Sequence, residues 1–420
     1  MSVTDLDPWL DSGADDLRQR LGPLRGTDDD DERVADAAAR AIWSVLTEPG
    51  DGVAGSLIAA HGATEALRAL RRMTPTSAVD PQLSKGMARW VPRMTEDAIE
   101  AAVRVARRTG MRIVVPGDED WPAGLDDLGA HAPHALWVRG PGLRELDGAA
   151  GVSVIGARAA TAYGERVAVD ICAELAARGL IVVSGAAYGI DGAAHRAALH
   201  AGGTTIGVLA GGADRAYPTG HSQLLTGVIE RGAVIAEVAP GTAPSKWRFL
   251  QRNRLIAAIS QATIVVEAGF RSGSLNTAGH AATLGRPLGA VPVPVSSAAS
   301  AGCHRLLREY DAICIRHADD VLELLGRPTR DPAHDAGTGG DATTALHAAR
   351  AGRATDDATR VLDALSARAT RSTQDLARRA GLDAADVEPL LGLLALEGLA
   401  VSADGGWRRA GGRSAESMRG

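Results

Sequence analysis

The chain has 420 residues, of which 45% are hydrophobic and 23% are charged, a composition typical of globular proteins and long enough for two or three domains of roughly 100 to 200 residues. No apolar run approaches the roughly 18 residues of a membrane-spanning helix, and the acidic N-terminus lacks the positive and apolar segments of a secretory signal. The three cysteines form no C-x-x-C pair, which excludes a disulfide framework and a zinc ribbon. We therefore expect a cytoplasmic protein with no membrane partner.

The net charge of −6 is unevenly distributed along the chain. Residues 1–32 hold ten acidic residues and three arginines with little apolar periodicity, and we interpret them as a disordered acidic leader. Residues 240–286 instead hold six cations and a single acid, Glu267. If the protein binds an anionic partner, that partner is expected there.

Apolar residues at helical spacing begin at Val34 and continue to Leu46, and further helices are expected over 53–72 and 95–110. Prolines and turn-rich stretches separate these segments. Together they predict a helical domain over 33–110. The following residues, up to 150, contain short apolar runs with proline and tryptophan and are interpreted as a connector with one or two strands.

From Val152 onward the sequence repeats one pattern, in which a short apolar run bounded by glycine precedes a segment with helical spacing. Such runs are typical of strands that are buried on both faces of a parallel sheet. The pattern predicts an α/β domain with a Rossmann-like, doubly wound and mostly parallel sheet, which with the connector covers 111–326. The expected strands are 152–156, 180–184, 204–209, 233–238, 262–267 and 287–291.

The C-terminal part begins with a segment, 327–355, that is rich in Gly, Ala, Thr, Asp and Pro and predicts a flexible linker. The linker is followed by three apolar stripes with helical spacing and by a final apolar segment around Trp407. They predict a winged helix-turn-helix domain over 356–410. Residues 411–420 are expected to form a tail.

The loop after the first expected strand, Gly156-Ala157-Arg158, departs from the G-x-G-x-x-G pattern that binds dinucleotides. The second strand ends in Ser184, where a ribose-binding acid would be expected. The sequence therefore argues against NAD and FAD, and we expect no cofactor and no metal ion. Arg158 can point a charged donor at a phosphate. The alternative is a structural arginine that caps carbonyl groups.

Two other loops at strand ends are rich in small residues and precede expected helices. Ser184-Gly185 begins one loop, and Arg271-Ser272-Gly273-Ser274 forms the other. Small residues let backbone amides approach an anion, and a helix N-terminus adds partial positive charge. The two loops favour contacts to more than one phosphate, although simple tight turns have the same composition.

The segment from Lys246 to Arg254 reads KWRFLQRNR and contains four cations, two aromatic residues and no acid. Phosphates require positive charge and unstacked bases require aromatic faces, so this combination is typical of proteins that bind single-stranded nucleic acid. We expect Phe249 to stack on a base rather than to pack in the core. The alternative is a solvated basic helix beside core aromatic residues.

Four motifs closely resemble the DprA/Smf family of DNA-processing proteins. In chain order they are Gly156-Ala157-Arg158, Ser184-Gly185-x-Ala187-x-Gly189-Ile190-Asp191-x-x-Ala194-His195, Phe249-x-x-Arg252-Asn253-Arg254 and Arg271-Ser272-Gly273-Ser274-Leu275-x-Thr277-Ala278. The resemblance is strong over 111–326, and a helical N-terminal domain (SAM- or helix-hairpin-helix-like) and a winged C-terminal domain also suit the family. It implies a cytoplasmic protein that binds and protects incoming single-stranded DNA, forms a homodimer through the Rossmann-like domain and helps to load RecA in natural transformation and recombination.

By the same resemblance, six residues match positions of the family that contact DNA, namely Arg158, Lys246, Phe249, Arg252, Asn253 and Arg254. Tyr188 and Leu250 depart from the family, which usually has arginine and proline at these positions. Together with the two small-residue loops, the candidate residues for single-stranded DNA are Arg158, Ser184, Gly185, Lys246, Phe249, Arg252, Asn253, Arg254, Arg271, Ser272, Gly273 and Ser274.

Two other functions remain open. The first is a nucleotide-binding or nucleotide-hydrolysing enzyme of the lysine-decarboxylase-like Rossmann group, but the loop at 269–274 lacks the proline, diglycine and glutamate of that group, so we expect no enzymatic activity. The second is a regulator that reads duplex DNA through the winged helix. Its third helix, expected over 384–397, contains three acids and neither lysine nor arginine, whereas helices in the major groove need donors.

Overall fold

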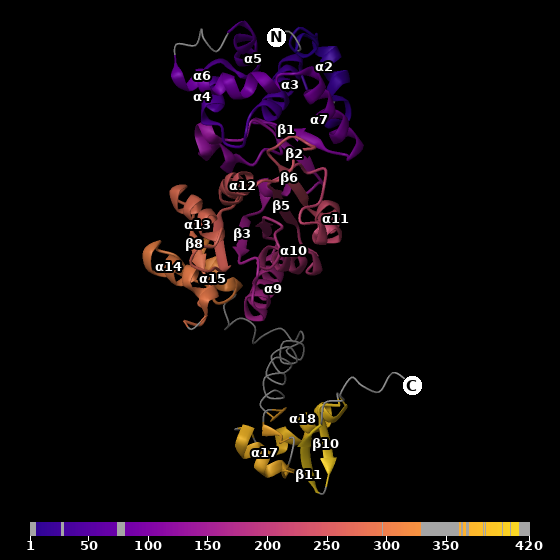
Figure 1. The fold of residues 1–420 in the computed structure, drawn as a ribbon, viewed down its shortest axis with the longest axis vertical. Coiled ribbons are helices and arrows are strands. Elements are labelled where there is room, and N and C mark those ends of the chain that lie inside the picture. Colours follow the sequence, from indigo (N-terminus) through magenta and orange to yellow (C-terminus); the bar gives the residue numbers. More distant parts are fainter. Residues whose placement is uncertain are drawn as a thin grey trace. The chain divides into compact units, whose positions relative to one another are not determined.

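The computed structural model describes residues 6–26, 29–73, 80–295 and 297–328, and most of 361–410. The chain divides into two compact units, Met1–Thr329 and Arg330–Gly420 (Figure 1). Apart from its first two residues, the predicted linker 327–355 lies outside the described residues, as does the predicted tail 411–420.

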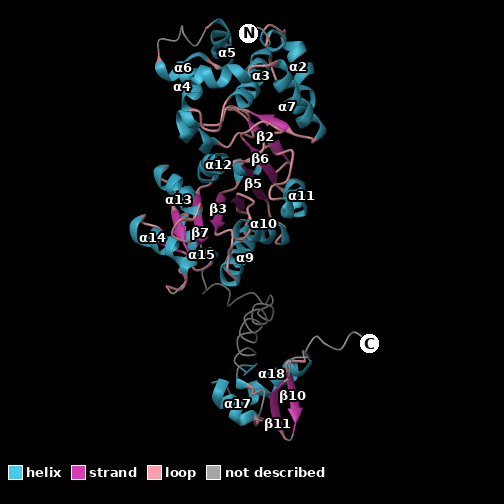
Figure 2. Ribbon diagram, in the orientation of Figure 1, coloured by secondary structure: helices cyan, strands magenta, loops and turns pink. Residues whose placement is uncertain are grey.

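The first unit is built on a nine-stranded sheet with the strand order β1-β2-β6-β5-β4-β3-β7-β8-β9 (Figure 2). The strands from β6 to β9 in this order are parallel, and β1 and β2 continue the sheet in antiparallel pairing. The predicted Rossmann-like, mostly parallel sheet is therefore confirmed. The strands are β1 (Arg112–Val114), β2 (Leu136–Arg139), β3 (Gly151–Gly156), β4 (Ile181–Ser184), β5 (Thr205–Leu209), β6 (Ala233–Ala236), β7 (Ala262–Glu267), β8 (Leu288–Ala290) and β9 (Ile313–Cys314).

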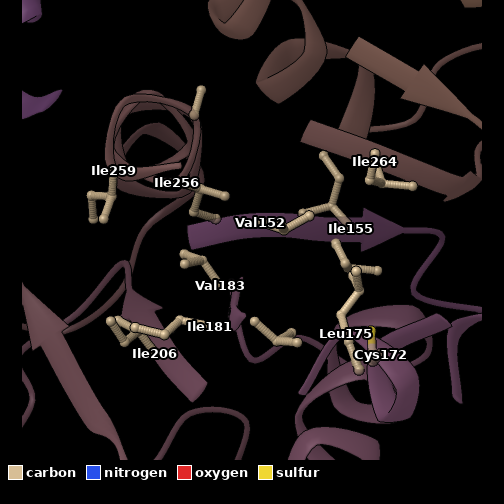
Figure 3. Packing of buried hydrophobic residues seen from close by; sticks show 14 of the residues in the cluster. Val152, Ile155, Cys172, Leu175, Ile181, Val183, Ile206, Ile256, Ile259 and Ile264 are labelled. Atoms are coloured by element: carbon tan, nitrogen blue, oxygen red, sulfur yellow. The ribbon is translucent and has the colours of Figure 1, made fainter. Parts of the chain in front are cut away.

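The strand order reverses between β3 and β7, because the chain passes from β3 through β4 and β5 to β6 and then returns to the other side of β3. Right-handed crossovers place helices before the reversal on one face of the sheet and helices after it on the other. Figure 3 shows Ile256 and Ile259 of α12 on one side of β3, and Cys172 and Leu175 of α9 on the other. The helices of this part are α9 (Ala162–Ala177), α10 (Ile190–His200), α11 (Ser222–Arg231), α12 (Lys246–Ile259), α13 (Ser274–Thr283), α14 (Ala301–Glu309) and α15 (Ala318–Leu324).

The N-terminal helices pack on β1, β2 and β6 and share one hydrophobic core with them. For example, the indole of Trp137 on β2 lies in this core and donates a hydrogen bond of 3.1 Å to Ser44 Oγ on α3. The predicted helical segment is thus joined to the sheet and does not form a separate compact unit. The helices are α1 (Asp7–Leu10), α2 (Ala14–Leu21), α3 (Asp31–Leu46), α4 (Gly52–His61), α5 (Ala63–Arg72), α6 (Pro81–Trp90) and α7 (Glu96–Arg108), and the short α8 (Glu145–Gly148) precedes β3.

The acidic N-terminal segment is ordered where the structure describes it, so the expectation of disorder over 1–32 is wrong there. Trp9, Leu17 and Leu21 are buried in the core of the helical layer. Arg25 pairs with Asp118, which fixes the segment to the loop after β1. Composition suggested disorder because the acids outnumber the apolar residues, but the described leucines and Trp9 of this segment are buried in one core.

The second unit contains α17 (Thr373–Ala380), α18 (Ala384–Leu396) and an antiparallel hairpin of β10 (Ala400–Ala403) and β11 (Gly406–Arg409). Val361, Leu376 and Leu391 are buried together in its core. The second and third predicted helical stripes thus overlap α17 and α18, and the final apolar segment overlaps the hairpin. In the part of the chain that the structure describes, no helix is both long and apolar enough to cross a lipid bilayer.

Candidate single-stranded DNA interface

A cleft of about 960 Å³ opens at the carboxyl ends of β3 and β7. Parallel doubly wound sheets bind ligands at such a reversal of strand order, because the two neighbouring loops diverge there. Three of the predicted segments meet in this switch-point cleft, namely the loop after β3, the loop after β7 and the first turns of α12. Its lining residues include Gly156, Arg158, Tyr217, Lys246, Phe249, Arg252, Asn253, Arg271, Ser272, Gly273 and Ser274.

Three exposed cations, Arg158, Lys246 and Arg271, line the cleft. Among the described residues none of them forms an ion pair, although arginines elsewhere in this unit, such as Arg25, are paired with acids. Unpaired cations around a concave surface raise the local concentration of anions and leave donors free for phosphate oxygens. The structure thus brings these three predicted residues together as a positive rim.

Phe249 also lines the cleft, where its ring is half-buried between charged and aromatic neighbours. The guanidinium carbon of Arg158 lies 4.8 Å from the ring centre, and that of Arg252 lies 5.8 Å from it. The ring of Tyr217 lies 5.6 Å away and is inclined by 51°. The cleft therefore combines positive charge with two aromatic rings, as binding of a single strand requires.

The loop between β7 and α13 is tied to the loop after β3. Ser274 Oγ donates a hydrogen bond of 2.8 Å to the carbonyl oxygen of Gly156, and the hydroxyl groups of Ser272 and Ser274 lie 3.1 Å apart. Gly273 directly precedes α13 and is exposed. The predicted residues of this loop thus lie at the cleft, and their hydrogen bonds hold the two loops side by side.

Ser184 and Gly185, in contrast, lie below the surface and are not among the residues that line the cleft. Ser184 Oγ donates a hydrogen bond of 2.7 Å to the carbonyl oxygen of Val154. The carbonyl oxygen of Gly185 accepts a hydrogen bond of 2.7 Å from Arg252. The prediction that they contact DNA is corrected to a structural role, because both residues are buried and bonded within the protein, and Ala187 is the residue of this loop that lines the cleft.

Arg252 and Asn253 form part of the floor of the cleft. Arg252 is only 5% exposed and donates to the carbonyl oxygens of Gly185 and Val208. Burial lowers the pKa of Arg252 to about 10, while the charge of nearby Asp191 acts in the opposite direction. The side-chain amide of Asn253 donates a hydrogen bond of 3.2 Å to Asn276 Oδ1. Both residues thus take part in hydrogen bonds within the protein, and the predicted phosphate contact stays a prediction, because both line the cleft and only Nε and Nη1 of Arg252 have partners among the described residues.

Arg254 does not line the cleft. Its guanidinium forms two hydrogen bonds, of 2.6 and 2.7 Å, to the Glu237 carboxylate and donates to the carbonyl oxygen of His131. The prediction that it contacts DNA is therefore corrected. On the same helix, Arg248 forms two hydrogen bonds of 2.9 Å to Glu48 in the helical layer. Both arginines attach α12 to neighbouring elements.

Tyr217 and Asp191 also line the cleft, although the sequence did not predict a role for either. The Asp191 carboxylate accepts hydrogen bonds of 3.2 and 3.3 Å from the amides of Gly185 and Ala187, and burial raises its pKa. The sequence signal that could have identified Asp191 was its position in the motif that begins at Ser184. Tyr217 comes from the long loop after β5, and only the fold brings it to Phe249.

Comparison with known proteins gives consistent matches. The sequence profile of the family described as DNA recombination-mediator protein A matches residues 112–326. A putative DNA processing protein DprA from Mycobacterium tuberculosis is 42% identical over 390 residues, which span 89% of this chain and 95% of that protein. Protein Smf from Escherichia coli is 40% identical over 46% of this chain and 51% of its own length.

A solved structure is similar to more than half of this chain. The X-ray structure of DprA from Streptococcus pneumoniae superposes with a TM-score of 0.56 at 29% sequence identity, covering 69% of this chain and 97% of that chain. The resemblance noted in the sequence motifs is therefore confirmed by independent matches of sequence and of structure. The chain belongs to the DNA recombination-mediator protein A (DprA/Smf) family.

Proposed function

We propose that the chain binds single-stranded DNA in the switch-point cleft with little sequence preference. This proposal is carried by three cations that form no ion pair with any described residue, Arg158, Lys246 and Arg271. They meet the rings of Phe249 and Tyr217 in one cleft. The names of the relatives, DNA processing protein DprA among them, support a role on DNA.

The cleft suits the chemistry of a single strand. Cations at the rim neutralise phosphates, and the rings offer faces for bases that are not stacked in a duplex. The polar side chains on the floor, Arg252 and Asn253, are hydrogen-bonded within the protein and therefore offer few free donors to base edges. Binding is expected to tolerate different sequences for this reason.

A titration of single-stranded and duplex oligonucleotides at several salt concentrations tests the proposal. We expect tighter binding of the single strand and a steep loss of affinity with salt, with a log-log slope of about −0.7 for each phosphate contact. Equal affinity for the duplex, or an affinity that is independent of salt, would contradict the proposal.

A role in binding rather than catalysis is part of this proposal. Glu267, the carboxylate that ends β7, is buried, and its Oε2 accepts a hydrogen bond of 2.8 Å from the amide of Thr161. This bond gives the carboxylate a structural partner and supports the binding role over the enzymatic alternative. Assays of nucleoside monophosphate hydrolysis test the alternative directly.

Further properties implied by the family likeness stay predictions. These are a homodimer formed through the Rossmann-like domain, help in loading RecA, a cytoplasmic location and a winged-helix fold for the second unit. The succession of α17, α18 and the β10–β11 hairpin supports the last of these. Light scattering at tens of micromolar protein tests the homodimer, since a monomer at that concentration would contradict it.

A further inference from the structure

Tyr217 is the more exposed of the two aromatic rings that line the switch-point cleft. It is 46% exposed, although it lies in a concave part of the surface. In the part of the chain that the structure describes, its hydroxyl group forms no hydrogen bond. A large ring with an open face in a positive cleft is able to stack on a nucleobase, which is flat and has two aromatic faces.

Phe249, the residue that the sequence suggested for stacking, is more crowded. The guanidinium group of Arg158 approaches its ring to 4.8 Å and that of Arg252 to 5.8 Å. The ring of Tyr217 also lies against it, at 5.6 Å and an inclination of 51°. Phe249 is thus well placed to support its neighbours and has little open face for a base.

We propose that Tyr217 is a base-stacking residue of this cleft and that Phe249 is a positioning residue that supports the Tyr217 ring and the Arg158 guanidinium. This inference rests on the proposed binding of single-stranded DNA and deepens it, because it names the ring that meets the base. Arg158 then lies beside the stacked nucleotide, where its charge can reach the adjoining phosphate.

Exposure by itself does not support this assignment, because Tyr163, Tyr188 and Tyr310 are also partly exposed. The place of Tyr217 among the cations of the cleft sets it apart. Tyr188 provides the contrast, since it is 49% exposed and its ring lies edge-on to His221 at 4.8 Å, outside the residues that line the cleft. It is therefore a matched control of the same residue type and exposure.

The test compares the full-length variants Tyr217→Leu, Tyr217→Phe and Tyr188→Leu in binding to oligothymidylate and to an oligonucleotide of equal length with abasic sites. We expect Tyr217→Leu to weaken binding of oligothymidylate about tenfold, since stacking on one aromatic ring has about this effect. Tyr217→Phe keeps a flat ring and should restore the affinity. Tyr188→Leu should bind as the wild type does.

The abasic strand separates stacking from other effects. It has the phosphates but lacks bases to stack, so Tyr217→Leu and the wild type should bind it equally. The salt dependence of Tyr217→Leu should match that of the wild type, because no phosphate contact is removed. Thermal unfolding of each variant confirms that the folded fraction is unchanged.

The outcomes distinguish this inference from the proposed function. If Tyr217→Leu binds oligothymidylate as the wild type does while Arg158→Ala is weakened, Tyr217 is not a stacking residue, and binding of single strands in the cleft still stands. Equal weakening on the abasic strand would also overturn the stacking role. If the wild type binds neither single strand, the inference and the proposed function both fail.

Discussion

The guanidinium carbon of Arg158 lies 4.8 Å from the centre of the Phe249 ring, although Arg158 lies in the loop after β3 and Phe249 lies on α12. A cation over an aromatic face gains about 0.5 to 1 kcal/mol at exposed sites. Among the described residues Arg158 forms no ion pair, so the ring holds the charge in the cleft without neutralising it. Its guanidinium remains available to an anionic ligand.

We expect Arg158→Ala to weaken binding of single-stranded DNA about tenfold, because a hydrogen bond to a charged group contributes roughly 1.5 to 3 kcal/mol. The log-log salt slope should become shallower by about 0.7, the value for one lost phosphate contact. Since Arg158 is exposed, the thermal midpoint should stay the same. Fluorescence anisotropy at several salt concentrations and a thermal melt measure these quantities.

Arg166→Ala is the control for this prediction. Arg166 is an exposed arginine on α9 and does not line the cleft. Its removal changes the net charge by the same amount but should leave the affinity nearly unchanged. If both variants weaken binding equally, the effect comes from net charge, and Arg158 has no specific contact.

The double variant Arg158→Ala/Phe249→Ala tests whether Phe249 acts through Arg158. If the ring positions the guanidinium, Phe249→Ala should weaken binding much less in the Arg158→Ala background than in the wild type. The difference should amount to about 0.5 to 1 kcal/mol of interaction free energy. Affinities are compared per folded molecule, with the folded fraction taken from urea unfolding. Additive losses would instead show that Phe249 does not act through Arg158.

The strands of the sheet were predictable because a parallel strand that is buried on both faces forms an uninterrupted apolar run. Each of the six expected strands overlaps an observed one, and β7 (Ala262–Glu267) has the expected bounds. The meeting of Arg158 with Arg271 was predictable for the same reason, since their loops follow strands at the reversal of strand order. Sequence periodicity and sheet topology are therefore sufficient to predict that Arg158 and Arg271 lie at the same site.

The roles of the arginines on α12 were not predictable in this way. Whether an arginine is free depends on acceptors from elements distant in the sequence, such as the Val208 carbonyl oxygen for Arg252 and Glu48 for Arg248. A count of cations in a segment does not contain this information. The same limit applies to Tyr217, because only the packing of the loop after β5 brings it to the cleft.

We expect Arg254→Ala to lower the free energy of unfolding by about 3 to 5 kcal/mol, because it leaves the Glu237 carboxylate buried without its partner. Arg248→Ala is the matched control on the same helix. It removes an ion pair with the more exposed Glu48, and a loss of about 0 to 1 kcal/mol is expected. Urea unfolding measures both values.

The double variant Arg254→Met/Glu237→Leu removes both charges and should regain much of the stability that Arg254→Ala loses. Single-strand affinity per folded molecule should be unchanged in every variant of this pair, because Arg254 lies outside the cleft. If Arg254→Ala kept its stability and lost DNA binding, the original assignment of Arg254 as a DNA contact would be restored.

Acid should destabilise the first unit through two buried histidines. Burial lowers the pKa of His134 to about 4 and that of His195 to about 3, whereas an unfolded histidine titrates near 6.5. As the pH falls below about 6.5, the unfolded chain binds protons that the folded chain does not, so stability decreases, by up to about 1.4 kcal/mol per pH unit for each histidine. This loss ends only near pH 4 for His134 and near pH 3 for His195.

The variant His195→Asn isolates the contribution of one histidine. Thr205 Oγ1 donates its proton to the carbonyl oxygen of Val182, so it accepts a hydrogen bond of 2.7 Å from Nδ1–H of His195. The side-chain amide of asparagine can donate to the same oxygen but does not titrate. Urea unfolding at pH 7, 6 and 5 should therefore show a shallower loss of stability for the variant than for the wild type. Parallel pH profiles would show that His195 gains its proton equally easily in the folded and unfolded chains, contrary to the effect of its burial.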